Sequence, residues 1–478
     1  MTTLRPYQTQ GIDELRSAFS AGARSALYVL PTGGGKTTIF VDVARRALER
    51  GKRVCVLAHR RELVEQASRR LDAFEIPHGI IAAGKRVHVP VCSRSGIAVA
   101  SVQTLVRREV DAFDLLVVDE AHHAPAGSWG KIIERMPSAR VLGVTATPCR
   151  LDGKGLASTF EKMILGPNYS ELIAGGFLTD ADVFAPTRPD MTGTKRRAGD
   201  YAAEEIDAAV NRPTITGSAV EHYLRLAMGK RAVAFCASVA HAEAVAEAFR
   251  YAGVPSACLH GKLDSDVRAA RLAELERGEL LVLTACDIVS EGFDLPALDV
   301  AILLRPTCSL GLYLQQVGRV LRPFVGKIRA LVLDHVGNVF RHGFPTEDRF
   351  WSLSEGAVHR APSTDDEAAF LIRQCPACFA VHRPSQVCVS CGHVYETRDK
   401  APEFSEGVLQ AITRRDAENR KQDEAERKQR AAEFRKKGWR AESIGELIEL
   451  ARDAGFDNPS GTAWQYAKWM ATKGRHVR

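Results

Sequence analysis

The sequence predicts an α/β protein with two parallel-sheet domains in tandem, followed by a small cysteine-rich segment and a charged helical tail. Three observations lead to this fold class. Short apolar runs alternate with helix-compatible stretches, that rhythm stops once and resumes, and after about residue 346 it ends. Near-continuous rather than alternating apolarity is typical of strands buried on both faces, as in a parallel sheet covered by helices.

Nine apolar runs are the candidate strands. Five of them precede a turn-rich, charged stretch (185–200), which indicates a linker. These five runs are SALYVL (25–30), RVCVLA (53–58), GIAVAS (96–101), LLVVDE (115–120) and RVLGVT (140–145). Four more runs follow the linker: KRAVAFCAS (230–238), ELLVLTA (279–285), DVAILLRP (299–306) and RALVLDH (329–335).

These runs and breaks divide the chain into six expected segments. They are a first α/β domain (1–184), a linker (185–212), a second α/β domain (213–346), a second linker (347–372), a cysteine-rich segment (373–397) and a charged helical tail (398–478).

Bulk composition is that of an ordinary globular protein, with 45% hydrophobic and 26% charged residues in 478. The N-terminus lacks a basic stretch followed by an apolar one, and no apolar run reaches the roughly 18–20 residues that span a bilayer. We therefore expect a cytoplasmic protein without membrane contact. The net charge of +7 is compatible with a polyanionic partner.

A glycine-rich loop, LPTGGGKTT (30–38), follows the first candidate strand and precedes a helix-compatible stretch. Glycines let backbone N–H groups wrap a phosphate, and a helix N-terminus favours an anion. The candidate phosphate-binding residues are Thr32, Gly33, Gly34, Gly35, Lys36, Thr37 and Thr38, with Lys36 on the outer phosphates and the Thr37 hydroxyl on Mg²⁺. The strict pattern has glycine where this chain has Leu30, and a simple turn is the alternative interpretation.

The run LLVVDEAH (115–122) ends a candidate buried strand in two carboxylates, which are costly to desolvate without a cation or water. A P-loop enzyme needs such groups opposite its loop, so we expect Asp119 in the Mg²⁺ shell and Glu120 orienting the attacking water. A solvated strand end is the alternative.

At these residues the chain resembles the superfamily two helicases of the DEAD/DEAH group, in the DNA-directed branch with XPB-like, UvsW-like and type III restriction translocase proteins. The resemblance covers about residues 3–345 and implies two RecA-like lobes with Mg·ATP between them. It implies adenine contacts for Arg5 and Gln8 in LRPYQTQGIDEL (4–15). It also implies nucleic-acid contacts for Arg60, Gln103, Thr104 and Ser238, and coupling roles for His122, Thr145, Thr147 and Gln315. It assigns no role to His123.

In the second domain, SEGFDLP (290–296) and YLQQVGRVLRP (313–323) resemble the family's last two motifs. The first implies nucleotide contacts for Gly292 and Asp294, although Cys286 stands where the family often has threonine. In the second, Arg319 and Arg322 lie three apart on an expected helix and hence on one face. If the lobes close on ATP, both can neutralise charge on the γ-phosphate; a solvated helix face is the alternative.

Four of the 11 cysteines cluster as Cys375-x2-Cys378 and Cys388-x2-Cys391, a spacing that can hold structural Zn²⁺ tetrahedrally. Iron, or four reduced cysteines without metal, are the alternatives. The tail has ten basic and six acidic side chains between Arg414 and Lys437, and carries Trp464, Tyr466 and Trp469 near its end. A solvated helix with packed aromatic residues competes there with strand contact by phosphate pairing and stacking.

The sequence thus predicts a monomer-capable, ATP-driven helicase or translocase that uses Mg²⁺ and structural zinc. DNA is favoured over RNA by the resemblance alone. An RNA helicase is the nearest alternative, and a nucleic-acid recruitment module that uses ATP as a conformational switch is the other.

Overall fold

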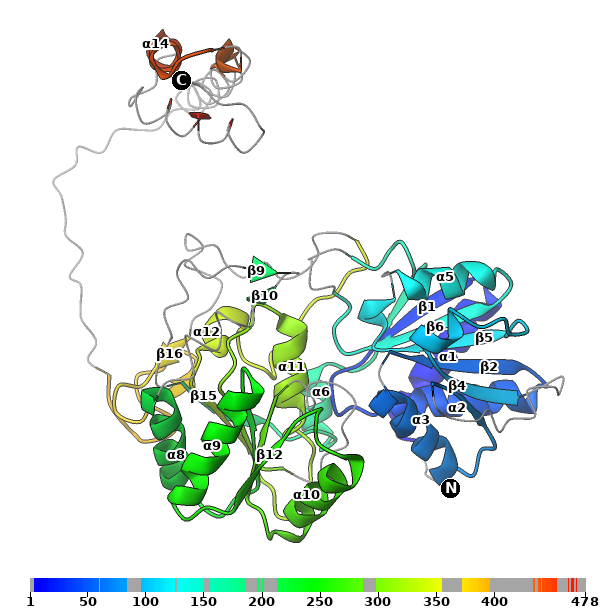
Figure 1. The fold of residues 1–478 in the computed structure, drawn as a ribbon, viewed down its shortest axis with the longest axis horizontal. Coiled ribbons are helices and arrows are strands. Elements are labelled where there is room, and N and C mark those ends of the chain that lie inside the picture. Colours follow the sequence, from blue (N-terminus) through cyan, green and yellow to red (C-terminus); the bar gives the residue numbers. More distant parts are fainter. Residues whose placement is uncertain are drawn as a thin grey trace. The chain divides into compact units, whose positions relative to one another are not determined.

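The computed structural model describes residues 4–59, 61–83, 96–124, 127–149, 155–185, 196–197, 200–201, 213–286, 298–354, 372–395, 433–434, 437–439, 441–453, 463, 466–467 and 470. The chain divides into two compact units, residues 1–396 and 397–478. The first unit holds both predicted sheets (Figure 1).

The first lobe is built on a seven-stranded sheet with the order β3-β4-β2-β5-β6-β1-β7, in which every pair is parallel. Its strands are β1 (Ser25–Val29), β2 (Arg53–Ala58), β3 (Gly79–Ile81), β4 (Gly96–Ser101), β5 (Leu115–Asp119), β6 (Arg140–Thr145) and β7 (Lys162–Leu165). Because parallel strands end at the same edge, the loops after β1, β2, β4, β5 and β6 meet there.

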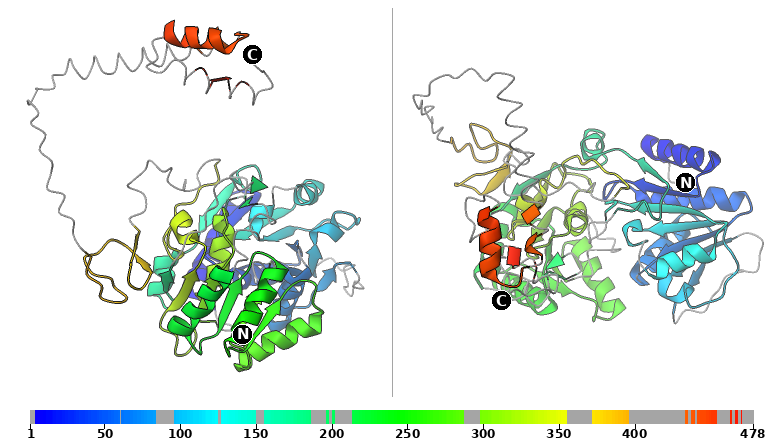
Figure 2. Two further views of the ribbon diagram at one scale, coloured as in Figure 1. Left: turned by 60° about the vertical axis from the view of Figure 1, so that its left-hand side comes forward. Right: turned by 90° about the horizontal axis from the view of Figure 1, so that it is seen from above.

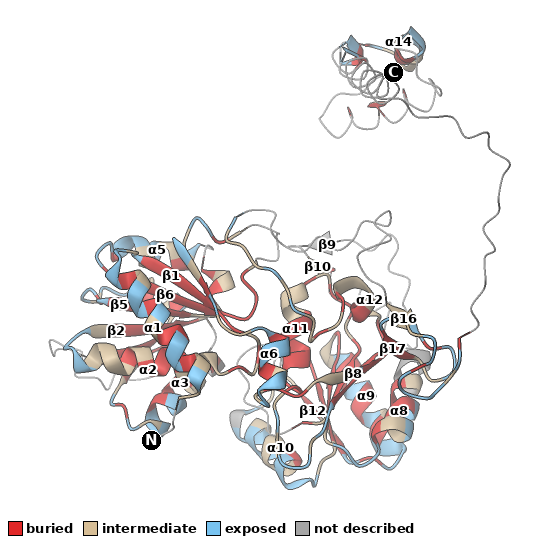
Figure 3. Ribbon diagram, turned by 180° about the vertical axis from the view of Figure 1, so that it is seen from behind, coloured by how far each residue is buried: buried red, intermediate tan, exposed pale blue. Residues whose placement is uncertain are grey.

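Helices cover both faces of this sheet, which is why its strands are almost continuously apolar. In β2, Val54 and Val56 pack in one core with the first three helices, whereas Cys55 and Leu57 pack in another with the helices at 102–105, 121–123 and 128–135. Figure 3 shows much of the ribbon of this sheet coloured as buried. The helices are α1 (Pro6–Ser20), α2 (Lys36–Glu49), α3 (Arg61–Ala73), α4 (Val102–Leu105), the 3-10 helix η1 (Ala121–His123), α5 (Ser128–Arg135) and α6 (Tyr169–Ala174).

The second lobe is built on an eight-stranded sheet with the order β12-β13-β11-β14-β15-β8-β17-β16. Its strands are β8 (Ala181–Phe184), β11 (Ala232–Phe235), β12 (Ser256–Leu259), β13 (Val282–Ala285), β14 (Val300–Leu303), β15 (Ala330–Asp334), β16 (Arg373–Gln374) and β17 (Ala380–His382). The first six strands in that order run parallel, and β17 and β16 are added antiparallel.

Helices again lie on both faces of the second sheet (Figure 2). Side chains of α8 and α9 share one core with the sheet, and those of α10, α11 and α12 pack in the other. These helices are α8 (Pro213–Ala227), α9 (Val239–Tyr251), α10 (Ser265–Arg277), α11 (Leu310–Gly318) and α12 (Asn338–His342).

The predicted fold class is confirmed, and each of the nine apolar runs contains a strand of the two sheets. Six further strands of the two sheets were not predicted: β3, β7, β12 and β16 lie at sheet edges, whereas β8 and β17 lie inside the second sheet. An edge strand has a neighbour on one side only and needs less apolar sequence. In β7 the four residues are exposed, half-buried, buried and exposed.

Strand β8 belongs to the second sheet, although the expected boundary at residue 184 assigned it to the first domain. It pairs in parallel with β15, from Ala330 opposite Ala181 to Leu333 opposite Phe184. The expected linker also holds the hairpin β9 (Arg196–Arg197) and β10 (Asp200–Tyr201). The Asp200 carboxylate accepts hydrogen bonds from Thr307 Oγ1 (2.8 Å) and Cys308 N (2.6 Å), which attaches this hairpin to the second lobe.

Residues 347–354, which we call the returning segment, run from the second lobe back onto the first. The carbonyl of Leu353 accepts hydrogen bonds from the amides of Leu156 (3.1 Å) and Ala157 (3.0 Å). The side chains of Trp351 and Leu353 pack against the first lobe's core. The start of the expected second linker is therefore a structural part of the first lobe.

The C-terminal unit contains α14 (Ile444–Asp453) and a small core around Phe434, Leu447, Tyr466 and Met470. Tyr466 is buried, with its ring centroid 5.2 Å from that of Phe434, so it packs as a core residue. Trp464, Trp469 and most of the charged stretch lie outside the described residues. Among the described residues, no helix has the length and apolarity required to span a bilayer.

Candidate nucleotide site at the seam between two lobes

The glycine-rich loop connects β1 to α2 at the edge where the parallel strands end. Gly33 (φ +89°) and Gly35 (φ +93°) adopt left-handed backbone that favours glycine, and Gly35 is the residue from which α2 begins at Lys36. Thr37 and Thr38 lie in the first turn of that helix. The backbone thus offers the free N–H groups of a helix N-terminus to an anion.

Leu30, the departure from the strict phosphate-loop pattern, is fully buried and points into the core. Its amide bonds Thr145 O (3.0 Å), and its carbonyl lies 3.4 Å from Lys36 Nζ. Burial lowers the pKa of Lys36, while the carboxylates of Glu120 and Asp119 act in the opposite direction. Leucine at this position therefore fills the core without entering the phosphate-binding side of the loop.

The predicted adenine-contact residues pack directly on this loop. Gln8 is buried, and its Oε1 accepts a hydrogen bond from Arg5 N (2.9 Å). Sequence reasoning missed Tyr7, whose hydroxyl donates to Gly34 O (2.6 Å) and accepts from Arg5 Nη1 (2.9 Å). It also missed Phe177, on which Tyr7 packs edge-on (centroids 5.1 Å) and over which Arg5 lies (4.8 Å). Tyr7 stood within the motif, whereas only the fold brings Phe177 to it.

The two carboxylates follow β5 at the same edge. Glu120 has φ +49°, a left-handed conformation that is strained for a residue with a side chain. Its Oε2 lies 3.5 Å from His122 Nδ1 and 3.3 Å from Gln315 Nε2, which comes from the second lobe. The Glu120 side chain is therefore held from both lobes.

Thr145 and Thr147 continue this network at the end of β6. Thr145 Oγ1 donates to Thr147 O (3.1 Å) and accepts from Thr147 N (3.2 Å). His122 Nδ1 lies 3.2 Å from Thr145 Oγ1. Because the hydroxyl proton of Thr145 is directed to Thr147 O, His122 Nδ1 is the donor in this contact. All four predicted coupling residues, His122, Thr145, Thr147 and Gln315, thus lie in one chain of contacts around Glu120.

One face of α11 forms the second lobe's side of the seam. Gly311, Gln315 and Gly318 are spaced four and three apart and so share a helix face. Gln315 reaches Glu120, and the missing Cβ atoms of the two glycines would point at Thr147 and Thr32. Glycine at these two positions allows α11 to approach the first lobe closely.

Replacing Gly318 with alanine is expected to lower ATP turnover at least about tenfold, because small misplacements at a reacting centre are costly. The added Cβ would lie 2.4 Å from Thr32 Cβ and 2.5 Å from Thr32 Cγ2, so the seam must widen. The matched control is Gly311→Ala, whose Cβ would be 3.1 Å from Thr147 Oγ1 and should cost much less. Steady-state turnover and melting temperature of both variants check this; equal turnover would contradict it.

The two arginines face the phosphate loop, but not from one helix face as predicted. Helix α11 ends at Gly318, Arg319 is its C-cap, and Arg322 lies beyond it. Pro323 disfavours helical backbone at Arg322, the residue before it. The Arg319 residue is 8% exposed. A Cβ placed on Gly33 would lie 3.6 Å from Arg322 Cγ, so Arg322 packs at the loop. Both guanidinium groups act to lower the pKa of Lys36.

The structure describes only some of the residues that are predicted to contact nucleic acid. Gln103 is exposed, and its Nε2 donates to His59 O (2.7 Å); Thr104 lies beside it in α4. Ser238 is the N-cap of α9, and its Oγ accepts from His241 N (3.0 Å). Arg60, Gly292 and Asp294 lie outside the described residues. Cys286, the departure from threonine, is buried with its thiol 3.7 Å from Ala237 O.

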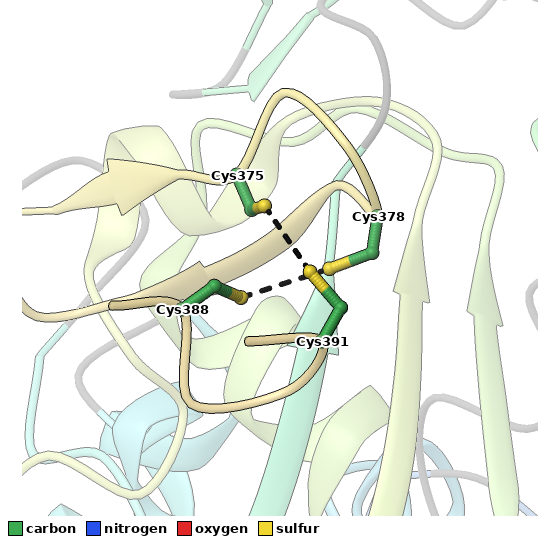
Figure 4. Close-up of side chains that lie close together, drawn as sticks. All are labelled: Cys375, Cys378, Cys388 and Cys391. Carbon is green, nitrogen blue, oxygen red and sulfur yellow. Dashed lines mark hydrogen bonds between the residues drawn. The ribbon is translucent and has the colours of Figure 1, made fainter. Parts of the chain in front are cut away.

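The four clustered cysteines point their sulfur atoms toward one another (Figure 4). All four lie within 4.8 Å, with Cys375 Sγ 3.6 Å from Cys391 Sγ and Cys378 Sγ 3.7 Å from Cys388 Sγ. Tetrahedral zinc with Zn–S bonds of about 2.3 Å places its sulfurs about 3.8 Å apart. The donor set and its spacing therefore fit such an ion.

Comparison with known proteins extends this picture. Residues 1–150 match the family model "Type III restriction enzyme, res subunit", and residues 217–323 match "Helicase conserved C-terminal domain". The chain is 31% identical over 375 residues to a 51.5 kDa protein of a Lactococcus phage, covering 77% of this chain and 78% of that protein. It is 27% identical to the putative ATP-dependent helicase IRC3 of Saccharomyces cerevisiae, covering 70% of this chain but only 51% of the yeast protein.

Among solved structures, the chain resembles the ATP-dependent type ISP restriction-modification enzyme LlaBIII bound to DNA. The TM-score is 0.54 at 16% identity, covering 70% of this chain and 28% of that one. This likeness shows a shared fold.

Two RecA-like lobes, a phosphate loop with opposed carboxylates and arginines from the facing lobe define a nucleotide-hydrolysing two-lobe motor. With both family models matched in this order, the chain belongs to the superfamily two helicases and is an ATP-dependent helicase. Helicases of this kind use ATP and Mg²⁺ and act on nucleic acid.

Proposed function

We propose that this helicase hydrolyses Mg·ATP at the seam and uses the resulting lobe movement to travel along DNA. The observation that carries the proposal is the Gln315–Glu120 hydrogen bond, which joins the second lobe to the expected catalytic carboxylate. Because Glu120 is contacted from both lobes, the position of its side chain depends on whether the lobes are closed. Hydrolysis and lobe position are then coupled through one side chain.

Each residue of the site has a role in this proposal. Lys36 and the loop formed by Gly33, Gly34 and Gly35 would hold the phosphates, and Thr32 and Thr38 line this loop. Arg5 and Gln8 would contact the base. Thr37 and Asp119 hold Mg²⁺, which would neutralise phosphate charge, and Glu120 orients the attacking water. Arg319 and Arg322 stabilise charge on the γ-phosphate from the second lobe. Gly292 and Asp294 are proposed to contact the nucleotide from that lobe.

Nucleic acid is proposed to lie across the strand ends of both lobes. Gln103, Thr104 and Arg60 would contact the backbone from the first lobe, and Ser238 from the second. Such contacts hold the strand without reading its sequence. Two gripping points on lobes whose separation follows ATP state would produce stepwise movement.

DNA is proposed as the substrate because the matched model is a restriction-enzyme subunit and the structural neighbour is described as bound to DNA. The test is ATP turnover with single-stranded DNA, duplex DNA, forked DNA and RNA, together with strand displacement and translocation assays. Stimulation and movement on DNA support the proposal. Stimulation by RNA alone identifies an RNA helicase, and ATP-dependent binding without movement identifies a recruitment module.

Zinc is proposed as the metal of the four-cysteine cluster, in a structural role. Strand β17 extends the second sheet by pairing with β8, and Cys375 and Cys388 are buried in the core beneath α8 and α9. Burial raises the pKa of the Cys375 thiol. Hydrogen bonds from the backbone N–H groups of Cys378 and Ala377, together with those of the neighbouring cluster thiols, more than offset this and lower the pKa to about 6, which favours the thiolate that a metal binds. The ion would therefore anchor an edge of the second sheet.

Removing this metal is expected to destabilise the second lobe by several kcal/mol, since binding free energy of a structural ion is folding free energy. Cys391→Ser tests this with little loss of packing, because the Cys391 side chain is exposed. The matched control is Cys308→Ser, a half-buried cysteine of the same lobe outside the cluster. Metal analysis should find one zinc per wild-type chain, and melting should fall only in Cys391→Ser. Absence of metal with unchanged melting would refute the site.

The cytoplasmic location and monomeric state stay predictions. Size-exclusion chromatography with light scattering, with and without DNA, would decide the second.

A further inference from the structure

His123 lies between the segment expected to touch nucleic acid and the expected catalytic carboxylate. Its ring packs on His122 (centroids 4.1 Å, 43° between planes) and on His59 (4.7 Å, 57°). Tilted ring pairs at such separations are favourable packing arrangements. The three imidazoles therefore form one continuous stack at the strand ends of the first lobe.

Each end of this histidine stack (His59, His123, His122) connects to a different function. At one end, the backbone carbonyl of His59 accepts from Gln103 Nε2 (2.7 Å), and Gln103 Oε1 accepts from Ser101 Oγ (2.8 Å). At the other end, His122 Nδ1 lies 3.2 Å from Thr145 Oγ1 and 3.5 Å from Glu120 Oε2.

The topology explains why residues so far apart in sequence meet. In the sheet, β2 lies between β4 and β5, with Ala58 opposite Ser101 and Leu57 opposite Val118. His59 follows β2, Gln103 follows β4, and Glu120 to His123 follow β5. The ends of three neighbouring strands thus bring the three histidines of the stack and Gln103 close together.

A second connection runs through the backbone. His123 N donates to Glu120 O (3.0 Å), and Glu120 holds a strained left-handed conformation (φ +49°). Strained conformations persist only where the surroundings hold them. A displacement of the His123 ring therefore reaches Glu120 both through His122 and through the turn that fixes the Glu120 backbone.

We propose that His123 is a positioning residue that transmits occupancy of the nucleic-acid segment at His59 and Gln103 to Glu120. The inference rests on the proposed function, because it requires nucleic acid to stimulate hydrolysis. It assigns His123 to stimulation and not to hydrolysis itself.

The test compares ATP turnover with and without single-stranded DNA in wild type, His123→Ala, His123→Phe and His59→Ala. His123→Ala should reduce the stimulation about tenfold, within the usual range of coupling between sites, and leave unstimulated turnover and the KM for ATP within about twofold of wild type. His123→Phe keeps a ring in the stack and should restore most of the stimulation. The double variant His59→Ala/His123→Ala should be no worse than the worse single variant.

The matched control is His78→Ala, another packed histidine of the first lobe, bonded to Ser68 Oγ (2.7 Å) and Ile76 O (2.9 Å). It should lower melting temperature without changing the stimulation ratio. An unchanged ratio in His123→Ala, a loss of unstimulated turnover in His123→Phe, or additive losses in the double variant overturns the inference. If no nucleic acid stimulates ATP turnover by the wild-type protein, the proposed function itself is contradicted, and this inference with it.

Discussion

Glu120→Gln is expected to lower ATP turnover by about 10²- to 10⁴-fold, the usual contribution of a positioned acid–base group. Glutamine keeps the size of the side chain and its contact with Gln315, but it cannot take the proton of the attacking water. ATP binding should therefore persist, and single-turnover kinetics beside a nucleotide-binding titration would separate the two steps. Turnover at the wild-type rate would remove Glu120 from the catalytic role.

The control for this variant is Glu134→Gln, an exposed carboxylate on α5 in the same lobe. It should change neither turnover nor nucleotide binding. A comparable loss in Glu134→Gln would point to a general effect of charge.

Replacing Arg319 or Arg322 with alanine should reduce turnover by about 10³-fold, as for arginine fingers in other nucleotide hydrolases. Both guanidinium groups act on the charge of Lys36, and Arg322 packs at Gly33. Lysine at either position should recover little, since a point charge does not reproduce the planar donor fork. Turnover at saturating ATP is the measurement, with binding measured separately.

Arg329→Ala is the matched control in the second lobe, where Arg329 pairs with Asp180 (2.9 Å) and Asp182 (2.8 Å) on the surface. Such exposed pairs contribute little to stability, and turnover should stay at the wild-type level. If Arg319→Ala and Arg322→Ala also keep wild-type turnover, hydrolysis is completed without the second lobe's arginines.

Local chemistry made much of the nucleotide site predictable from the sequence. The glycines at 33–35 need left-handed or closely approached backbone, and Asp119-Glu120 need a cation or water at the end of an apolar strand. The buried strands were predictable for a similar reason, because burial on both faces demands continuous apolar residues.

The parts that were not predictable depend on partners far apart in sequence. Nothing within β8 or the two-residue β16 says that one pairs with β15 and the other closes the hairpin of the four-cysteine cluster on the same sheet. The seam face of α11 and the contact of Phe177 with Tyr7 likewise arise only when the lobes assemble. The histidine stack was not predictable either, because two adjacent histidines indicate no function until the ends of three strands bring His59 and Gln103 to them.

The returning segment makes the first lobe discontinuous in the chain, with the second lobe from β8 to α12 inserted before its last piece. During synthesis the amides of Leu156 and Ala157 cannot form their hydrogen bonds to Leu353 O until Leu353 has left the ribosome. By then β15 and α12 have already emerged. A fragment cut after residue 346 would lack that piece. Isolating the nucleotide-binding half as a stable fragment therefore requires residues 347–354 to be supplied, in the same chain or as a separate peptide.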